Sequence, residues 1–136
     1  MAAVARTLST CIFCKIIKGE IPSFKLIETE TSYSFLDIVP LSRGHALIIP
    51  KDHAAKLHEL PDEYLADVMP IAKKIATAQG PENYYNILQN NSRITHQVVD
   101  HVHFHIIPKP DASDEEGLSD VIEEVKKYRQ ELLGKL

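Results

Sequence analysis

Alternation of apolar and polar residues predicts the strands of this chain. Successive side chains of a strand point to opposite faces, so an alternating run bounded by turn residues is typical of a strand with one buried face. The stretch TSYSFLDI alternates in this way, and HALIIP is a short apolar run that suits a buried strand. Five strands are predicted, over residues 21–29, 31–38, 45–50, 83–91 and 101–108.

A different spacing, with apolar residues three or four positions apart, predicts three helices. The first covers residues 11–19 and the third covers residues 119–133. The second covers residues 60–80, and we expect Pro70 to kink it because proline removes a helix hydrogen bond. Its predicted apolar stripe comprises Leu65, Val68, Met69, Ala72, Ile75 and Ala76.

Strands with hairpin-length links and segregated helices predict an α+β domain. We expect a mainly antiparallel sheet of about five strands, a long central helix and a C-terminal helix. A length of 136 residues suits one domain with its own core. Residues 1–10 are predicted to be a flexible tail before a domain over residues 11–136, and PDASDEEG a solvated linker.

Charge and composition exclude several classes of function. A net charge of −4 with no basic block argues against a nucleic-acid polymer as partner, so a bound phosphate must be held by local donors. No apolar run approaches transmembrane length, and the first ten residues lack the apolar core of a secretory signal. We therefore expect a protein of the cytoplasm, or of cytoplasm and nucleus, that does not act at a membrane.

His101, His103 and His105 occupy alternate positions of the last predicted strand. They therefore share one face, whereas Val102 and Phe104 face the core. Three interpretations fit this row: solvent-facing polar residues, a catalytic metal site completed by further ligands, and nucleophilic catalysis by neutral imidazole. Histidine has no special preference for strands, so three in register favour a chemical role.

Cys11 and Cys14 have the spacing C-x-x-C. In a reducing compartment such a pair is a metal clip, a redox pair, or two small buried residues of a helix. A redox pair is disfavoured because no thioredoxin-like strand–helix–strand pattern surrounds it. The spacing leaves the other two interpretations open.

Three segments in a fixed order resemble the histidine-triad (HIT) superfamily of nucleotide-binding proteins. They are CIFCKIIKGEIPS near the start, FLDIVPLSRGHALIIPKDH in the middle, and NILQNN followed by HQVVDHVHFHIIP near the end. HVHFHII matches the family's signature of histidines alternating with apolar residues. The chain most resembles the fungal and bacterial members of the branch that hydrolyses adenosine 5'-monophosphoramidates.

The resemblance implies a HIT-like fold and an enzyme that hydrolyses AMP (or GMP) linked to an amine or lysine, through a covalent AMP-histidine. His103 matches the nucleophile, and His105 would hydrogen-bond the phosphate or protonate the leaving group. His101 would orient the neighbouring site, and His45 matches a fourth histidine that steadies the nucleophile's ring. A homodimer is also implied, with no redox cofactor and no catalytic metal.

The resemblance further implies a nucleotide-binding set. Asp37 matches a ribose-binding carboxylate, and Asn90 matches an asparagine that donates to the phosphate. The residues alone are equally typical of turns. An apolar base slot would be lined by Ile38 with Phe13, Phe35 or Ile16, all of which also suit a plain core. The loop His96, Gln97 and Val98 would complete the phosphate cradle.

Two positions depart from the family pattern. Ser92 replaces a glycine, and serine is strained there if the position has a positive φ. Val98 replaces a serine of the animal members, and valine cannot hydrogen-bond a leaving group. Protonation of the leaving amine would then rely on His105, on Thr95 or on water.

The resemblance also implies a structural zinc ion. Its ligands would be Cys11, Cys14, His53 and His101, a Cys2His2 set that suits tetrahedral zinc. In that case His101 has a structural role, and His103 and His105 carry the catalysis.

Two further functions stay open on the sequence. A diadenosine polyphosphate hydrolase would use the same His103 on a phosphoanhydride, and a non-catalytic regulatory protein would bind purine nucleotides without turnover. A metal hydrolase would lose its activity to chelators, whereas a histidine nucleophile would keep it.

Overall fold

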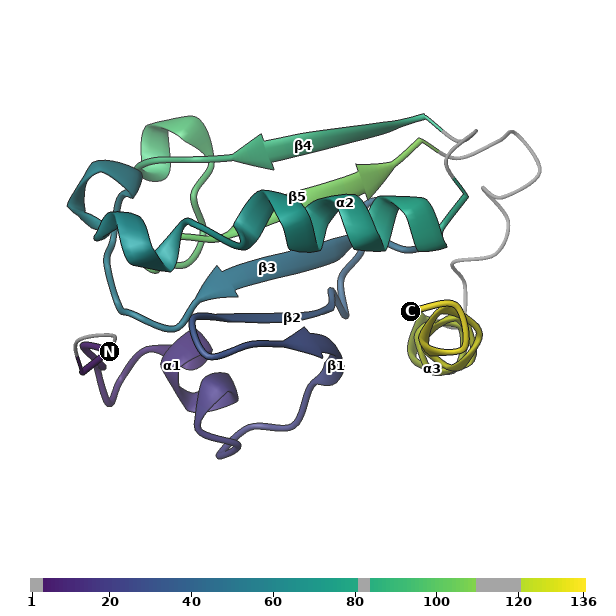
Figure 1. Cartoon of the computed structure of the whole chain (residues 1–136), viewed down its shortest axis with the longest axis horizontal. Helices are drawn as coiled ribbons and strands as arrows, with labels where there is room; N and C mark the ends of the chain where they lie inside the picture. The colour runs from purple at the N-terminus through teal and green to yellow at the C-terminus, as the bar shows by residue number, and fades with distance from the viewer. Residues whose placement is uncertain (1–3, 81–83, 110–120) are drawn as a thin grey trace.

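The computed structural model describes residues 4–80, 84–109 and 121–136, and the predicted acidic linker lies outside them. Figure 1 shows the helices of the described residues arranged around one sheet. In chain order the elements are α1 (Ile12–Ile17), β1 (Phe24–Glu28), β2 (Ser32–Leu36), β3 (Ala46–Pro50), α2 (Val68–Ala78), β4 (Tyr85–Gln89), β5 (Phe104–Pro108) and α3 (Val121–Leu133). Short 3-10 turns cover Leu57–Glu59, Asp62–Tyr64 and Arg93–Thr95.

The sheet has the order β1-β2-β3-β5-β4, and each neighbouring pair is antiparallel. The five predicted strands and the α+β class are thereby confirmed. The last strand begins at Phe104 rather than at residue 101. Val102 leaves the ladder because its backbone N–H donates to the carbonyl of Ala54, 2.8 Å away.

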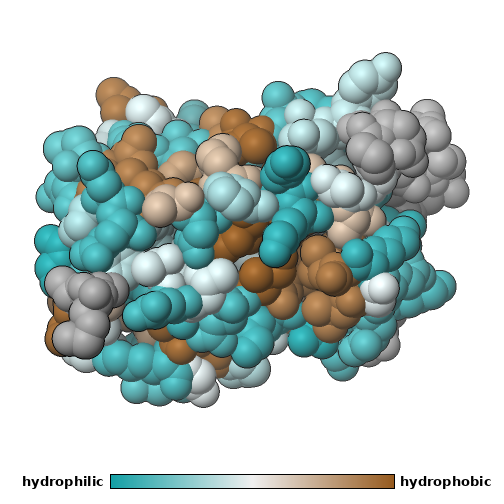
Figure 2. Space-filling model, viewed as in Figure 1, coloured by the Kyte–Doolittle hydropathy of each residue, from teal (hydrophilic) through white to brown (hydrophobic). Residues whose placement is uncertain are grey.

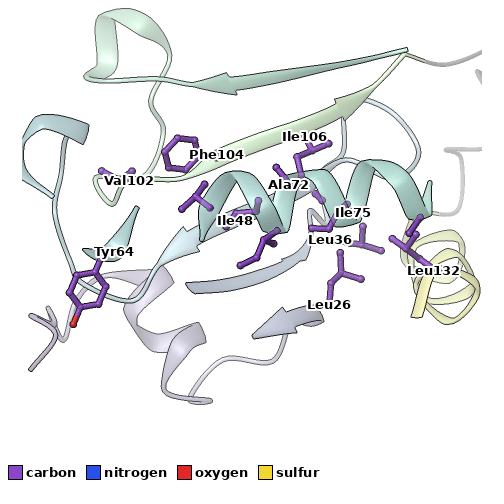
Figure 3. Packing of buried hydrophobic residues seen from close by; sticks show 14 of the residues in the cluster. Leu26, Leu36, Ile48, Tyr64, Ala72, Ile75, Val102, Phe104, Ile106 and Leu132 are labelled. Atoms are coloured by element: carbon purple, nitrogen blue, oxygen red, sulfur yellow. The ribbon is translucent and has the colours of Figure 1, made fainter. Parts of the chain in front are cut away.

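Two apolar clusters lie on opposite faces of the sheet. The larger one packs β-strand residues such as Ile48 and Ile106 under α2 and α3 (Figure 3). The smaller one packs Phe13 and Ile16 of α1 against Tyr33, Phe35, Leu47 and Ile49. Every residue of β3 is buried, as the continuous apolar run predicts for a central strand covered on both faces.

The predicted helix over residues 60–80 is shorter than expected. It begins at Val68, so Pro70 lies in its first turn, where a missing N–H costs no helix hydrogen bond and no kink is needed. Val68, Ala72, Ile75 and Ala76 are buried as predicted, but Met69 is 47% exposed. None of the described helices is long and apolar enough to cross a membrane. On the face of the molecule seen in Figure 1, hydrophilic side chains cover most of the surface, and hydrophobic ones gather near its centre (Figure 2).

Residues 4–10 make contacts that a flexible tail would lack. The guanidinium of Arg6 contacts the carboxylate of Asp52, whose residue is 2% exposed. The carbonyl of Arg6 also accepts a hydrogen bond from the backbone N–H of His53 at 2.8 Å. These contacts hold the segment around Arg6 against the loop after β3, because a buried carboxylate is stabilised by a cation. The domain boundary at residue 11 stays a prediction.

Candidate functional site

The row of histidines lies on the face of the sheet that α1 covers. The rings of His103 and His105 are 4.9 Å apart between centroids, and Phe13 of α1 meets His103 edge-on at 5.1 Å. His101 is fully buried and His103 is 5% exposed. Val102 and the other alternate residues enter the opposite cluster, as predicted. The interpretation of the row as solvent-facing residues is therefore wrong.

A backbone hydrogen bond sets the tautomer of His103. Its Nδ1 lies 2.7 Å from the carbonyl oxygen of His101, which can only accept, so Nδ1 carries the proton. In a neutral ring Nε2 is then the unprotonated nitrogen. Burial lowers the pKa of His103 below its usual range, against the raising effect of that backbone hydrogen bond. The ring is therefore neutral near pH 7, with a lone pair on Nε2.

A chain of hydrogen bonds fixes the opposite tautomer in His105. The backbone N–H of Leu41 donates to Nδ1 of His45 at 3.1 Å, so a neutral His45 carries its proton on Nε2. That nitrogen donates to Nδ1 of His105 at 2.9 Å. His105 is left with its proton on Nε2, and burial lowers its pKa to about 4, assisted by the neighbouring His103 and His45.

The position of His45 differs from its implied role. Its ring hydrogen-bonds His105 and not the nucleophile candidate His103. The reason is the register: His105 pairs with Leu47 of β3, so His45, two residues earlier, shares that face of the sheet and lies diagonally beside it. His45 thus orients the ring of His105 rather than that of His103.

The loop before His45 is held by both long helices. Gly44 has a φ of +86°, and its carbonyl accepts a hydrogen bond from Nε2 of Gln79 at 2.6 Å, just after α2. A Cβ on Gly44 would approach Gln79 to 2.9 Å and Tyr128 of α3 to 3.0 Å. The required glycine conformation and this close approach together place His45 against β5.

Asp37 lies beside His45, close to the row of histidines. It follows β2, and its Oδ1 accepts from the backbone N–H of Val39 at 2.9 Å. Its Oδ2 is 3.8 Å from Nε2 of His45, and the side chain is 23% exposed. A ligand hydroxyl can therefore reach this carboxylate. Among the four candidates for a base slot, Ile38 is 58% exposed, whereas Phe13, Phe35 and Ile16 are core residues.

The loop after β4 supplies the other candidates, and Ser92 has an unusual backbone. Its φ of 87° and ψ of 161° lie in a region that is otherwise nearly reserved for glycine. The condition under which serine is strained at this position, a positive φ, is therefore met. The loop is kept in place by Gln97, which accepts from the N–H of Ser92 at 2.7 Å and donates to the carbonyl of Ala55 at 2.7 Å.

Two of the candidates for a phosphate cradle stabilise their own loop through hydrogen bonds, and the other two are exposed. Gln97 is 2% exposed, and Asn90 donates its amide to the carbonyl of Thr95. These two side chains hold the loop itself, each through one of the two N–H bonds of its amide. His96 and Val98 are exposed.

A second group of side chains forms a candidate metal centre. The ligand atoms of Cys11, Cys14, His53 and His101 all lie within 4.8 Å of one another. Sulfur–nitrogen distances are 3.5 Å from Cys11 to His101 and 3.4 Å from Cys14 to His53. A tetrahedral zinc ion, with bonds of about 2.3 Å to sulfur and about 2.0 Å to nitrogen, requires edges of about 3.5 Å. These four residues are positioned to bind a metal.

The surroundings of the metal centre prepare its ligands. Nε2 of His101 lies 2.8 Å from the carbonyl of Pro50, so it carries the proton and Nδ1 turns its lone pair to the thiols. Cys11 is the N-cap of α1, and its sulfur accepts from the N–H of Cys14 at 3.5 Å. This convergence is the only one of its kind in the described part of the chain, and it includes neither His103 nor His105.

Sequence reasoning missed the pair Arg6 and Asp52 beside the metal centre. Asp52 stands in the segment PKDH, next to the predicted ligand His53 and directly after a fully buried strand. A carboxylate in such a place is a signal of a buried ion pair. The sequence could not say which of the chain's cations would meet it.

We predict that Ser92→Gly stabilises the protein. Backbone strain of this kind costs about 1–3 kcal/mol, and the extra freedom of glycine in the unfolded chain removes about 0.5–1 kcal/mol of the gain. The expected net gain is about 1 kcal/mol in urea denaturation. Ser92→Ala is the matched control: it keeps the strained Cβ, and the structure shows no capping hydrogen bond from the serine hydroxyl. Equal stability of the glycine and alanine variants would contradict the strain.

Comparison with known proteins supplies the family. Residues 18–112 match the HIT domain. The adenosine 5'-monophosphoramidase hnt1 of Schizosaccharomyces pombe is 66% identical over 109 residues, 80% of each chain. The adenosine 5'-monophosphoramidase HNT1 of Saccharomyces cerevisiae is 57% identical over all of this chain and 89% of its own.

Solved structures agree with this match. A histidine triad nucleotide-binding protein from Candida albicans superposes with a TM-score of 0.72 at 50% identity, covering 90% of this chain and 99% of its own. A histidine triad family protein from Mycobacterium smegmatis, described as Zn-bound, superposes with a TM-score of 0.75 at 32% identity, covering 92% of this chain and 94% of its own. With the alternating histidines buried beside α1, the chain belongs to the HIT domain family.

Proposed function

We propose that the protein hydrolyses purine nucleoside 5'-monophosphoramidates, in which AMP is linked to an amine or a lysine. The observation that carries the proposal is the pair of complementary tautomers. His103 has an unprotonated Nε2, and the neighbouring His105 has a protonated Nε2. A nucleophile beside a hydrogen-bond donor is the arrangement that attack on an anionic phosphorus requires. The names of the fungal relatives support the same reaction class.

In the first step, Nε2 of His103 attacks the α-phosphorus and the phosphorus–nitrogen bond breaks. The ring becomes cationic as the new bond forms, and the carbonyl of His101 stabilises it because the hydrogen bond from Nδ1 becomes charge-assisted. The departing amine takes a proton from water, or from His105 after the bound phosphate has made that ring an imidazolium. Water then attacks the AMP-histidine, gives a proton to His105 or to the solvent, releases AMP and restores the neutral His103.

His105 acts on the phosphate as a neutral donor. With a pKa lowered to about 4 by burial, the ring carries no charge at pH 7 in the free protein. An anionic phosphate brought beside its Nε2 raises that pKa, so a larger fraction of the ring is the imidazolium that can give a proton to the leaving amine. His45 supports this function because it occupies the opposite nitrogen of the ring.

Asp37 and Ile38 bind the nucleoside in this proposal. The carboxylate of Asp37 is partly exposed beside His45 and accepts from the ribose hydroxyls. Ile38 is the exposed apolar residue next to it and contacts the base. A diadenosine polyphosphate would use the same nucleophile, so the leaving group decides between the two substrate classes.

We predict a covalent AMP on His103 when the protein is mixed with an adenosine phosphoramidate and quenched early. Peptide mass spectrometry locates the adduct, and His103→Ala abolishes both adduct and turnover. His58→Ala, at an exposed histidine, is the control with unchanged activity. Because the lowered pKa keeps His103 neutral, kcat/KM should fall with acid only below the ordinary histidine value of about 6.5.

The same experiment with diadenosine triphosphate separates the alternatives. An adduct formed mainly from the dinucleotide would replace the phosphoramidase proposal with the dinucleotide hydrolase. AMP binding without adduct or turnover from either compound would leave a nucleotide-binding protein without this chemistry.

We infer that the metal of the Cys2His2 set is zinc with a structural role. Two thiols and two imidazole nitrogens at these distances suit tetrahedral Zn²⁺. Protein side chains would occupy all four coordination positions, which leaves no open position for a substrate. When bound, zinc would join α1 to the loop after β3 and to the segment before β5. The ligands are Cys11, Cys14, His53 and His101.

We expect about one zinc per chain by plasma mass spectrometry of the purified protein. Removal by a chelator should lower the Tm by several degrees and leave the AMP-histidine chemistry of His103 intact once the protein is folded. Cys11→Ser should reduce the zinc content, whereas Ser23→Ala, outside the metal set, should not. A zinc content near zero in protein purified without chelators would contradict this inference.

We propose a homodimer that pairs through β4. This strand is at the edge of the sheet, and an edge leaves one row of backbone hydrogen-bonding groups unpaired. Tyr85 and Ile87 are 44% and 45% exposed on it, and Met69 of α2 is 47% exposed. Apolar side chains at an open edge suit a second copy of the chain, because a two-fold contact joins like surfaces.

Light scattering after gel filtration tests the dimer. The wild-type chain should elute with twice the chain mass, and Ile87→Arg should shift it to a single chain because a charge would be buried in the contact. Val4→Arg, at a residue 97% exposed, serves as the control and should remain dimeric. A monomeric wild type at tens of micromolar would refute the proposal.

A further inference from the structure

The segment Arg6–Leu8 lies beside the metal centre, outside the part of the chain that matches the HIT domain. Figure 1 shows the N-terminal segment next to α1 and the start of the loop after β3. Its backbone contacts two of the metal ligands. The carbonyl of Arg6 accepts from the N–H of His53 at 2.8 Å, and the N–H of Leu8 donates to Sγ of Cys14 at 3.5 Å.

The side chain of Arg6 fixes the residue before His53. Its Nε and Nη2 contact Oδ2 of Asp52 at 3.0 and 2.5 Å, and its backbone N–H donates to Oδ1 at 2.6 Å. Nη2 also donates to the carbonyl of Glu59 at 3.1 Å. Within the described residues, Arg6 supplies every hydrogen bond that the side chain of Asp52 accepts. Asp52 is 2% exposed, so no other cation replaces this one without rearrangement.

The ligands come from three separate parts of the chain. Cys11 is the N-cap of α1 and Cys14 lies within it, His53 follows β3, and His101 precedes β5. His101 is held by the carbonyl of Pro50 and by its burial. Among the described residues, the ring of His53 contacts Cys14 and His101 rather than a carbonyl, and its backbone N–H donates to Arg6. The position of His53 relative to Cys14 therefore depends on the segment that touches both.

We propose that Arg6–Leu8 is a clamp that positions the metal ligands, with Arg6 as a positioning residue that acts through Asp52 and His53. Arg6 touches no metal itself. It holds His53 at the distance from Cys14 that a shared ion requires, and Leu8 donates a hydrogen bond to the Cys14 sulfur, which stabilises its thiolate form. The proposal rests on the metal set and is independent of the nucleotide reaction.

The test measures metal binding directly on the full-length protein. Metal-free wild type, Arg6→Ala and Arg6→Lys are titrated with Co²⁺, whose visible spectrum reports tetrahedral coordination by two sulfurs and two nitrogens. Zn²⁺ affinity follows from competition with a chromophoric chelator. Partners outside the ligand shell typically contribute 10–100-fold to metal affinity, so Arg6→Ala should bind at least tenfold more weakly. Arg6→Lys keeps the charge without the planar fork and should fall between the two.

Two controls separate positioning from general stability. Arg93→Ala removes an arginine from an ion pair in which both side chains are largely exposed, and it should bind both metals as the wild type does. Arg6→Ala/Asp52→Asn leaves no buried charge without a partner, so it should regain thermal stability while its metal binding stays weak. If Arg6→Ala does not fold, Arg6→Lys and the double variant still give the comparison.

Wild-type Co²⁺ spectra and Zn²⁺ affinity in the folded Arg6 variants would overturn the clamp, as would an equal loss in Arg93→Ala. A wild-type protein that binds neither metal would overturn it as well, and would leave the nucleotide function untouched. Weakened binding confined to the Arg6 variants, with the spectrum altered and the double variant thermally stable, is the result we expect.

Discussion

The hydrogen bond from Nδ1 of His103 to the backbone carbonyl of His101 is the constraint on which the site depends. It decides which nitrogen of His103 is free, and it does so with a group that no side-chain substitution removes. The same residue, His101, offers its own Nδ1 to the metal centre and its Nε2 to the carbonyl of Pro50. One fully buried residue therefore orients the nucleophile through its carbonyl and belongs to the metal centre through its ring.

Burial makes these histidine rings reactive at neutral pH because it keeps them uncharged. A histidine in water is partly protonated near pH 6.5, and a protonated ring has no lone pair for attack. Phe13 of α1 packs edge-on against His103, so the helix that carries both cysteines also removes water from the nucleophile. Burial is also the main reason why the pKa values of His101 and His105 fall to about 4. His103 and His105 are therefore both neutral at pH 7 and have opposite tautomers.

The structure joins segments that are distant in sequence at two places. At one end of the row, Gln79 and Tyr128 from the two long helices meet Gly44 and fix the loop that leads to His45. At the other end, Arg6 meets Asp52 and lies against His53. Each contact acts one or two residues away from a ring in the row or in the metal centre. The site is thus held from outside by groups that carry no chemistry of their own.

The sequence by itself determined the elements and the identity of the chemical groups. Alternation placed the five strands, because a one-residue slip would exchange the buried faces, and it placed the three histidines on one face. The match to the family pattern identified the four metal-positioned residues, and it marked Ser92 as strained if its φ is positive, which it is.

Only the tertiary structure decided the partners. Helical spacing could not show that α2 begins at Val68, because the residues before it form a short 3-10 turn with local i to i+3 hydrogen bonds. Nor could it show that His45 contacts His105, that Gln97 holds its loop through hydrogen bonds, or that Arg6 pairs with Asp52. A hydrogen bond or an ion pair needs two groups within about 3 Å, and for residues far apart in the chain that distance is set by how the sheet and helices pack.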